Sequence, residues 1–127
     1  MKNAPKKRVL ILEDDDMVRL IVKDYLEVSG FEILESGDAL SAIEMIKKNV
    51  CDIAIVDINI PQMSGESFIT KAKQITPNIQ VIIHTGSSDY KVNATMKAMG
   101  LSQNNVLVKP VEDMNMFIKI IQRLLDQ

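Results

Sequence analysis

The sequence predicts a single α/β domain: a doubly wound, five-stranded parallel sheet with helices on both faces. Two observations support this prediction. Short apolar segments alternate five times with longer segments of helical periodicity, which is typical of doubly wound folds. The short segments are almost wholly apolar, as strands are when helices cover both faces of the sheet. With 127 residues, 46% of them hydrophobic and 25% charged, the chain is long enough for one such domain over residues 1–127.

The first strand is predicted over residues 9–12, after a loosely ordered lead of residues 1–7. A helix is predicted to begin at Asp16 and to end before Gly30, because glycine suits the position that follows a helix. The apolar residues of this segment recur at the spacing of one helix face, and they are Val18, Ile21, Val22, Tyr25 and Leu26.

A second strand is predicted over residues 31–36, and Asp38 is expected to cap the helix after it. Leu40, Ile43 and Ile46 are expected to face inward from that helix. The third strand is the apolar run over residues 53–57, which ends on the carboxylate of Asp57.

A third helix is expected to begin after Ser64 as its cap and to end before Pro77. Its inward residues are predicted to be Phe68, Ile69, Ala72 and Ile75. Residues 79–84 predict a fourth buried strand. The fourth helix, from about residue 89 to residue 99, has few apolar residues to face inward: Val92, Met96 and Met99.

A polar linker over residues 101–105 leads to a fifth strand over 106–108, and a final helix is predicted over 113–125. Its inward residues are expected to be Met114, Phe117, Ile118, Ile121 and Leu125. Met116 and Ile120 would then lie off this face. They form a candidate surface for a homodimer or another partner, although single exposed apolar residues are also normal.

Charge and composition exclude several classes of protein. A net charge of −2 gives no basic footprint for direct nucleic-acid binding. No apolar stretch approaches the length that spans a membrane, and the one after the basic start is too short for a signal peptide. The single cysteine, Cys51, excludes an intrachain disulfide and favours a reducing, cytoplasmic location. We expect Cys51 to pack rather than to react.

Polar side chains follow four of the five predicted strands: Glu13 and Asp14, Asp57, Thr85 and Lys109. The carboxyl ends of parallel strands share one edge of the sheet, where ligands bind in such folds. Carboxylates about 4 Å apart repel by roughly 4 kcal/mol per pair, so the three acids need a cation or shared protons. An all-oxygen site suits Mg²⁺. The second strand ends in Ser36 and Gly37, which offer no such group.

A carboxylate beside a bound metal can accept a phosphoryl group and form an acyl phosphate. Asp57 is the candidate acceptor, with Lys109 and the Thr85 hydroxyl holding the phosphoryl oxygens. The alternative is a set of solvated acids at strand ends and at a helix N-terminus, where acids are stabilising. The occurrence of polar or charged residues at four strand ends argues against this alternative.

Other phosphate-binding sites fail on their residues. The chain lacks both the P-loop and the dinucleotide-binding glycine patterns. A flavin site would need a loop rich in hydroxyl side chains after the first strand, to bind the flavin phosphate. This chain instead has four consecutive acids over residues 13–16, which would repel a phosphate. His84 could be a ligand or a phosphohistidine, but a packed histidine at the strand end is favoured because no acidic or cysteine partner lies beside it in sequence.

Four stretches together resemble the receiver domain of two-component response regulators, over essentially the whole chain. They are residues 8–15, RVLILEDD; residues 55–65, IVDINIPQMSG; residues 82–86, IIHTG; and residues 108–110, VKP. Each stretch alone is a weak signal, but their order and spacing are specific. With this resemblance we predict the flavodoxin-like strand order 2-1-3-4-5.

The resemblance implies a role for each of these residues. Asp57 is implied to be the phospho-acceptor, Asp14 a direct Mg²⁺ ligand, and Glu13 a ligand through water, with the backbone carbonyl of Asn59 as a further ligand. Thr85 is the implied switch hydroxyl and Lys109 the lysine that pairs with the phosphoryl group. The Lys109–Pro110 bond is implied to be cis.

The chain departs from the family pattern in the region that transmits the signal. Val106 stands where the fifth strand usually carries Tyr or Phe, and Val111 where Phe usually follows Lys-Pro. The linker over residues 101–105 is also longer than usual. These departures concern the output of the signal and leave the residues of the phosphorylation chemistry intact.

The resemblance therefore implies a single-domain response regulator, a phosphoprotein of two-component signal transduction. It is a signalling receiver rather than a conventional enzyme, and supports only its own Mg²⁺-dependent phosphorylation and dephosphorylation. A histidine kinase or phosphotransfer protein would donate the phosphoryl group, and a downstream protein would respond. Two alternatives stay open: a phosphorelay shuttle without an output conformation, and an interaction module that works without phosphorylation.

Overall fold

The computed structural model describes residues 5–126 and contains one five-stranded parallel sheet. The strands are β1 (Arg8–Leu12), β2 (Glu32–Ser36), β3 (Ile53–Val56), β4 (Gln80–Thr85) and β5 (Val106–Val108). Their order is β2-β1-β3-β4-β5, so the predicted flavodoxin-like order is confirmed. The expected loose lead falls partly on residues 1–4, which lie outside the described residues.

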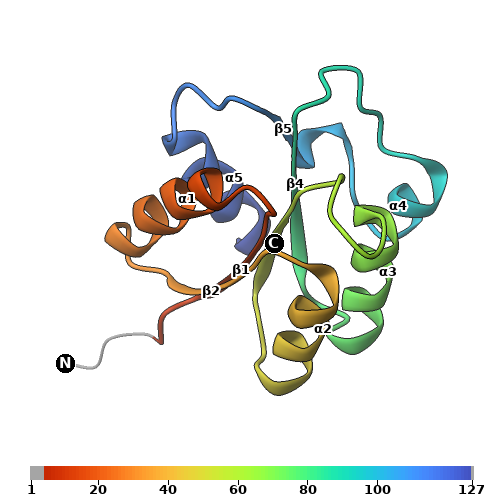
Figure 1. The fold of residues 1–127 in the computed structure, drawn as a ribbon, viewed down its shortest axis with the longest axis horizontal. Coiled ribbons are helices and arrows are strands. Elements are labelled where there is room, and N and C mark those ends of the chain that lie inside the picture. Colours follow the sequence, from red (N-terminus) through yellow and green to blue (C-terminus); the bar gives the residue numbers. More distant parts are fainter. Residues whose placement is uncertain (1–4, 127) are drawn as a thin grey trace.

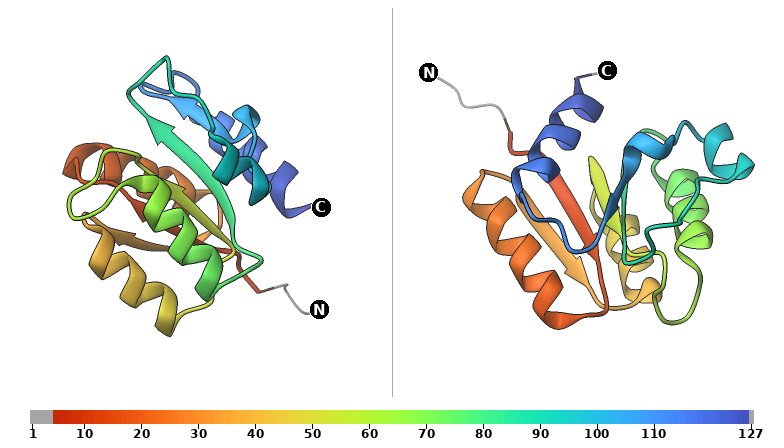
Figure 2. Two further views of the ribbon diagram at one scale, coloured as in Figure 1. Left: turned by 90° about the vertical axis from the view of Figure 1, so that its right-hand side faces the viewer. Right: turned by 90° about the horizontal axis from the view of Figure 1, so that it is seen from above.

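Five α-helices connect and follow the strands, with a short 3₁₀ helix before β5. They are α1 (Asp16–Val28), α2 (Ala39–Lys48), α3 (Gly65–Ile75), α4 (Ala94–Ala98) and α5 (Asn115–Leu125), and the 3₁₀ helix is Gln103–Asn105. Helices α1 and α5 lie on one face of the sheet, and α2, α3 and α4 on the other (Figure 1). Figure 2 shows the same two helical layers from two further directions.

Two apolar clusters fill the space between the sheet and its helices. Alternate residues of β1 point to opposite faces, so Leu10 and Leu12 pack towards α2 and α3, while Val9 and Ile11 pack towards α1 and α5. All four are at most 1% exposed. Burial on both faces explains why the strands appear in the sequence as continuous apolar runs.

The register brings the carboxyl ends of the strands to one level. Leu12 is paired with Val56 on one side and with Ser36 on the other. The Asp57 N–H continues the ladder by donating to the Leu12 carbonyl at 3.0 Å, and the Lys109 N–H donates to the Thr85 carbonyl at 2.7 Å. The residues that follow these strands therefore emerge beside one another.

The predicted helix caps are confirmed. Asp38 accepts a hydrogen bond from the Ser41 N–H and Ser64 accepts one from the Ser67 N–H. Gly30 follows α1 with a φ of 103°, a left-handed value that glycine adopts without strain.

Three residues predicted to face inward are exposed: Ile21 by 50%, Leu40 by 55% and Ile75 by 37%. On α2 the buried positions include Ala39 and Ala42, whose small side chains fit against the sheet. Ile21 and Leu40 lie next to buried residues, Val22 and Ala39, from which a helix turns about 100° per residue away from the core. Ile75 is the last residue of α3, beyond its last buried residue, Ala72. The inward faces are narrower than the apolar patterns suggested.

Helix α4 is much shorter than the predicted span of about residues 89–99. It contains five residues, and Asn93 caps it by accepting from the Met96 N–H. The segment before α4 bonds instead to the side chain of Gln103, which accepts from the Val92 N–H at 3.2 Å and donates to the Tyr90 carbonyl at 2.8 Å. These backbone groups are satisfied outside a helix, so the segment has no need to extend α4.

The prediction for the inward face of α5 was wrong at Ile120. This residue is 6% exposed and packs in the core, since the true face follows the helical spacing of Phe117, Ile120, Ile121 and Leu124. Of the two residues, only Met116 is exposed, by 38%. The proposed dimer surface of Met116 and Ile120 therefore loses one of its two residues.

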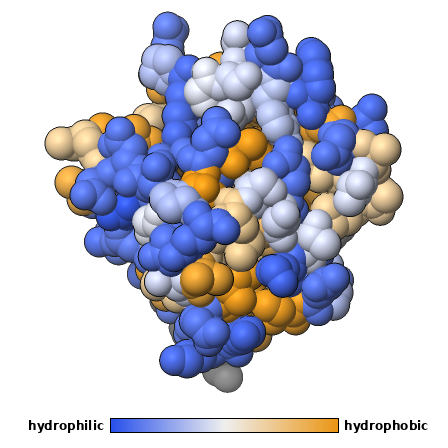
Figure 3. Space-filling view, turned by 45° about the vertical axis from the view of Figure 1, so that its right-hand side comes forward, coloured by the Kyte–Doolittle hydropathy of each residue, from blue (hydrophilic) through white to orange (hydrophobic). Residues whose placement is uncertain are grey.

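Hydrophilic side chains divide the apolar surface on the face that carries α3 and α4. Apolar side chains gather in separate areas at the centre and bottom of the view in Figure 3. Among residues 5–126, none of the helices combines the length and apolar character needed to cross a membrane.

Candidate functional site

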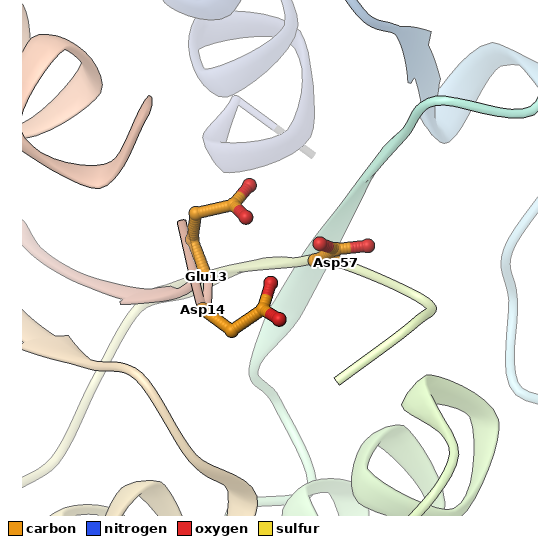
Figure 4. Close-up of side chains that lie close together, drawn as sticks. All are labelled: Glu13, Asp14 and Asp57. Atoms are coloured by element: carbon orange, nitrogen blue, oxygen red, sulfur yellow. The ribbon is translucent and has the colours of Figure 1, made fainter. Parts of the chain in front are cut away.

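Three carboxylates meet at the carboxyl end of the sheet, as predicted. Glu13 and Asp14 follow β1 and Asp57 follows β3, and one oxygen of each lies within 4.8 Å of the others. Figure 4 shows the three side chains extending from these two strand ends into a shared region. Asp14 is exposed, whereas Glu13 and Asp57 are only 2% and 6% exposed.

Glu13 is held by its backbone and by both oxygens of its side chain. Its N–H donates to the Ser36 carbonyl at 3.0 Å, and its Oε2 accepts from the Asp15 N–H at 3.2 Å. Its Oε1 is buried 2.6 Å from Lys109 Nζ, an ion-pair contact that leaves this oxygen without an aligned hydrogen-bond donor. Burial raises the pKa of Glu13 and the nearby Asp57 charge raises it further, against the opposing effects of Lys109 and the Asp15 N–H.

Both side-chain oxygens of Asp57 have a defined partner. Oδ1 accepts from the Asn59 N–H at 3.0 Å, and Oδ2 lies 3.0 Å from Lys109 Nζ. The carboxylate is thus fixed in orientation while it stands at the open edge of the sheet. Asn59, predicted to supply a backbone carbonyl ligand, is placed directly beside Asp57 by this contact.

Lys109 extends from the end of β5 to both buried acids. Its ammonium contacts Glu13 at 2.6 Å and Asp57 at 3.0 Å. Burial alone would lower the pKa of Lys109, but the two carboxylates outweigh it and the pKa is raised. The peptide bond from Lys109 to Pro110 is cis, as the resemblance implied.

Thr85 ends β4 next to this group and is completely buried. Its hydroxyl accepts from the Ser87 N–H at 3.1 Å, and its carbonyl accepts from the Lys109 N–H at 2.7 Å. In this state the hydroxyl is engaged with its own loop, and the backbone connects it to Lys109. The structure therefore joins Thr85 to the site through β5 rather than through a contact with Asp57.

The donor set fits Mg²⁺. Three carboxylates and one ammonium leave a formal charge of −2, which one divalent cation would neutralise. Carboxylate and carbonyl oxygens with an open, solvent-facing side are the ligands that Mg²⁺ prefers. Lys109 compensates only one of the three negative charges, so a bound cation would relieve the repulsion that remains among the carboxylates.

The loop after Asp57 is packed so closely that it allows little variation. A Cβ on Gly65 would lie 2.7 Å from Ile58 Cα and 3.0 Å from the Asp57 carbonyl oxygen, so only glycine fits without displacement. Gln62 has a φ of 83°, a strained value for a side-chain-bearing residue. Its Oε1 accepts from the Leu40 N–H at 2.9 Å, which ties the loop to α2.

His84 packs in the core, as predicted. It is 5% exposed, and its ring meets the Phe117 ring edge-on at a centroid distance of 5.1 Å. Burial, assisted by the positive charge of Lys109, lowers the pKa of His84 to about 4, so the ring is neutral at pH 7. It lines an apolar cavity of about 200 Å³ between α1 and α5 that also contacts Ile21 and Lys109.

Cys51 is also a core residue. It is 1% exposed in the cluster beneath α2 and α3. Burial raises the pKa of its thiol to about 11, which removes the thiolate needed for reaction at neutral pH.

The comparison with known families agrees with this geometry. The model of the response regulator receiver domain matches residues 9–122, nearly the whole chain. The chain belongs to the receiver domain family. Receiver domains bind Mg²⁺ at an acidic pocket and interact with histidine kinases and phosphotransfer proteins.

Relatives of this receiver domain include both larger and similarly sized proteins. It is 34% identical over 116 residues to a cyclic di-GMP phosphodiesterase of Thermotoga maritima, of which it spans only 30%. It is 29% identical to the chemotaxis protein CheY of the same organism, with 84% of this chain and 88% of CheY covered. A CheY-like receiver domain structure from Methanospirillum hungatei matches with a TM-score of 0.78 and 26% identity, over 96% of each chain.

The structure brings Glu13, Asp14, Asp57 and Lys109 of this receiver domain together and leaves the Thr85 hydroxyl turned towards Ser87. Sequence reasoning missed Arg19, which reaches the site from α1. Its Nη1 donates to the Glu13 carbonyl at 2.7 Å. The only signal in the sequence is a basic residue within the first turns of a helix that starts in acids, which by itself indicates a surface ion pair.

Proposed function

We propose that this chain is a single-domain response regulator that accepts a phosphoryl group on Asp57 and thereby changes its affinity for a partner protein. The observation that carries the proposal is the contact of both Asp57 oxygens with fixed donors, Asn59 N–H and Lys109 Nζ, beside two further carboxylates. Such a carboxylate is oriented for attack and adjoins a site for a divalent cation.

Each predicted residue has a role in this proposal. Asp14 and Asp57 would bind Mg²⁺ directly, with Glu13 acting through water and the Asn59 carbonyl as a further ligand. A bound Mg²⁺ would neutralise charge on the carboxylates and on the phosphoryl oxygens. Lys109 would exchange its contact with Asp57 for one with a phosphoryl oxygen, and the Thr85 hydroxyl would leave Ser87 to donate to another.

The reaction itself is a transfer between two nucleophiles. An Asp57 carboxylate oxygen attacks the phosphorus of a phosphohistidine on a histidine kinase or phosphotransfer protein. The phosphorus–nitrogen bond breaks, and the imidazole leaves and takes a proton. In a separate, second step, water attacks the phosphorus of the acyl phosphate, the bond from phosphorus to the Asp57 oxygen breaks, and inorganic phosphate leaves with the Asp57 carboxylate restored. Because chemistry of this kind depends mainly on positioning and charge neutralisation, the chain needs no further catalytic base.

The phosphoryl group would then shift an equilibrium between two conformations of the segment from Thr85 to α4. A change from mostly inactive to mostly active needs a differential stabilisation of about 5 kcal/mol. New charge-assisted bonds from Thr85 and Lys109 are of that order when taken together. We place this reaction in the cytoplasm, where a lone cysteine such as Cys51 stays reduced.

A phosphorelay shuttle without an output conformation is the second candidate. The observation that favours it is Val106 on β5, where an aromatic residue would follow the switch hydroxyl inward. One relative, at 26% identity over 94 residues, is the sporulation initiation phosphotransferase F of Bacillus subtilis. A shuttle would exchange its phosphoryl group rapidly with a histidine and bind its partners equally well in both states.

The test of the main proposal is labelling with a small acyl phosphate, followed by intact-protein mass spectrometry. We expect one phosphoryl group per chain with Mg²⁺ and none with a chelator. Asp57→Asn should remain unlabelled, while Asp24→Asn, which removes an exposed acid of α1 outside the site, should be labelled like wild type. Equal labelling of wild type and Asp57→Asn would contradict the proposal.

A further inference from the structure

Arg19 of α1 makes contacts on three sides at the edge of the acidic site. Its Nη1 donates to the Glu13 carbonyl at 2.7 Å, its Nη2 contacts Asp16 at 2.6 Å, and its Nε contacts Glu35 of β2 at 3.1 Å. The side chain is only 18% exposed. A planar guanidinium with several fixed donors can hold such a geometry, and a lysine cannot.

The Glu13 carbonyl belongs to the peptide group that links Glu13 to Asp14, so Arg19 fixes the backbone from which Asp14 projects. Within the described residues, the Asp14 carboxylate itself accepts no hydrogen bond and is exposed. Its position is therefore determined by the backbone beneath it. That backbone is held by the Glu13 N–H to Ser36 carbonyl bond at 3.0 Å and by Arg19.

Glu35 in turn holds Arg19 in place. It accepts from Arg19 Nε through Oε1 and contacts Lys23 Nζ at 2.9 Å through Oε2. On the other side, Gly37 leaves room for the guanidinium, since a Cβ there would lie 3.2 Å from Arg19 Nη1. The end of the second strand, which offers no group to the acidic site directly, thus supports it through Arg19.

We propose that Arg19 is a positioning residue that sets the Mg²⁺ affinity of the acidic site by fixing the Glu13–Asp14 peptide group. The inference rests on the proposed function and adds to it a residue that touches neither metal nor phosphoryl group. Groups that orient metal ligands through hydrogen bonds commonly change metal affinity when they are removed.

Electrostatics and positioning predict opposite signs for the loss of Arg19. Removing a positive charge near a cation site should by Coulomb's law alone strengthen Mg²⁺ binding. If Arg19 positions Asp14, its removal should weaken binding despite the lost charge. Lys23→Met provides the matched control, because it also removes one positive charge and one contact with Glu35 but leaves the Glu13 carbonyl bonded.

The experiment is a calorimetric titration of the purified chain with Mg²⁺ alone, together with thermal unfolding of each variant without metal. We expect Arg19→Met to bind Mg²⁺ about tenfold more weakly than wild type, and Lys23→Met to bind within a factor of about two of wild type. A purely structural role would lower the melting temperature and leave the affinity of the folded protein unchanged.

The possible outcomes separate the two proposals. Affinity of Arg19→Met equal to or tighter than that of wild type overturns the positioning role, as does an equal loss in both variants. If wild type itself binds no Mg²⁺, the proposed function fails at its metal site and the role of Arg19 fails with it.

Gly37→Ala carries the test if Arg19→Met does not fold. The added methyl group would press on Arg19 Nη1 without changing any charge, and the φ of Gly37 is not in the left-handed region. We expect a smaller but measurable loss of Mg²⁺ affinity. Unchanged affinity in this variant would then overturn the inference.

Discussion

His84 is a buried base in the core of a receiver domain, and its neutrality is a condition of the folded state. Its ring packs against Phe117, and burial holds its pKa at about 4, far below the ordinary value near 6.5. As the pH falls below 6.5, the unfolded chain binds a proton that the folded chain cannot. The contribution of the neutral His84 ring to the free energy of unfolding is therefore fully present above pH 6.5 and decreases as the pH falls towards 4.

This difference predicts a pH effect that can be isolated by substitution. Between pH 7 and pH 5, His84 should reduce the free energy of unfolding by about 2 kcal/mol. Urea unfolding of wild type and His84→Leu at both pH values measures it, since other titrating groups are shared. The same pH dependence in both proteins would show that His84 is protonated in the fold or exposed to water.

The β3–α3 loop shows how closely an element is packed behind the reacting carboxylate. Helix α3 begins at Gly65, whose N–H donates to the Ile58 carbonyl at 3.0 Å. A methyl group at this position would meet backbone atoms of Ile58 and Asp57 as well as the Ile58 side chain. Relief would require displacement of the loop that positions Asp57.

We expect Gly65→Ala to lower the free energy of unfolding by about 1–3 kcal/mol, the usual range for overpacking a tight site. Gly86→Ala is the matched control, because a Cβ at Gly86 has no atom within 4 Å. Chemical denaturation of both variants measures the two free energies of unfolding. Two equally stable variants would mean that the loop shifts freely and does not hold Asp57.

Elements with strong local signals were predictable from the sequence, and elements shaped by distant contacts were not. The apolar run before Asp57 and the caps Asp38 and Ser64 identified β3, α2 and α3, because burial and capping act within a few residues. The length of α4 depends on Gln103, which satisfies the backbone of Tyr90 and Val92 from the 3₁₀ helix. No local pattern records that contact.

The same distinction applies to the site. Strand ends of a parallel sheet meet by topology, so Glu13, Asp14, Asp57 and Lys109 could be predicted to converge. The engagement of the Thr85 hydroxyl with Ser87 and the contact of Arg19 with the Glu13 carbonyl depend on side-chain conformations that the sequence does not record. Ile120 was misplaced because two apolar helical stripes overlap on α5.

At the scale of the whole molecule, the sheet couples both helical layers into one structure. Apolar residues of β1 contribute to both core clusters, so the loss of either layer would expose the other side of the same strands. We therefore predict that residues 5–126 form one folding unit, with a single cooperative unfolding transition.

Cys51 provides a probe of this cooperativity. The thiol is buried, with its pKa raised to about 11, so a thiol reagent at pH 7 should label it only after unfolding. The urea midpoint for labelling in short pulses should coincide with the midpoint from circular dichroism. A labelling transition at clearly lower urea would reveal a separate unit and contradict the single domain.

We propose that the Asp57 carboxylate, and no other group, receives the phosphoryl group, and chemical reduction tests this most directly. Borohydride reduces an acyl phosphate on aspartate to homoserine, whereas a phosphate ester or phosphohistidine at His84 is not reduced. After labelling with a small acyl phosphate and Mg²⁺, reduction and peptide mass spectrometry should find homoserine at position 57 alone. Homoserine at another position, or a phosphoryl group that resists reduction, would contradict the account.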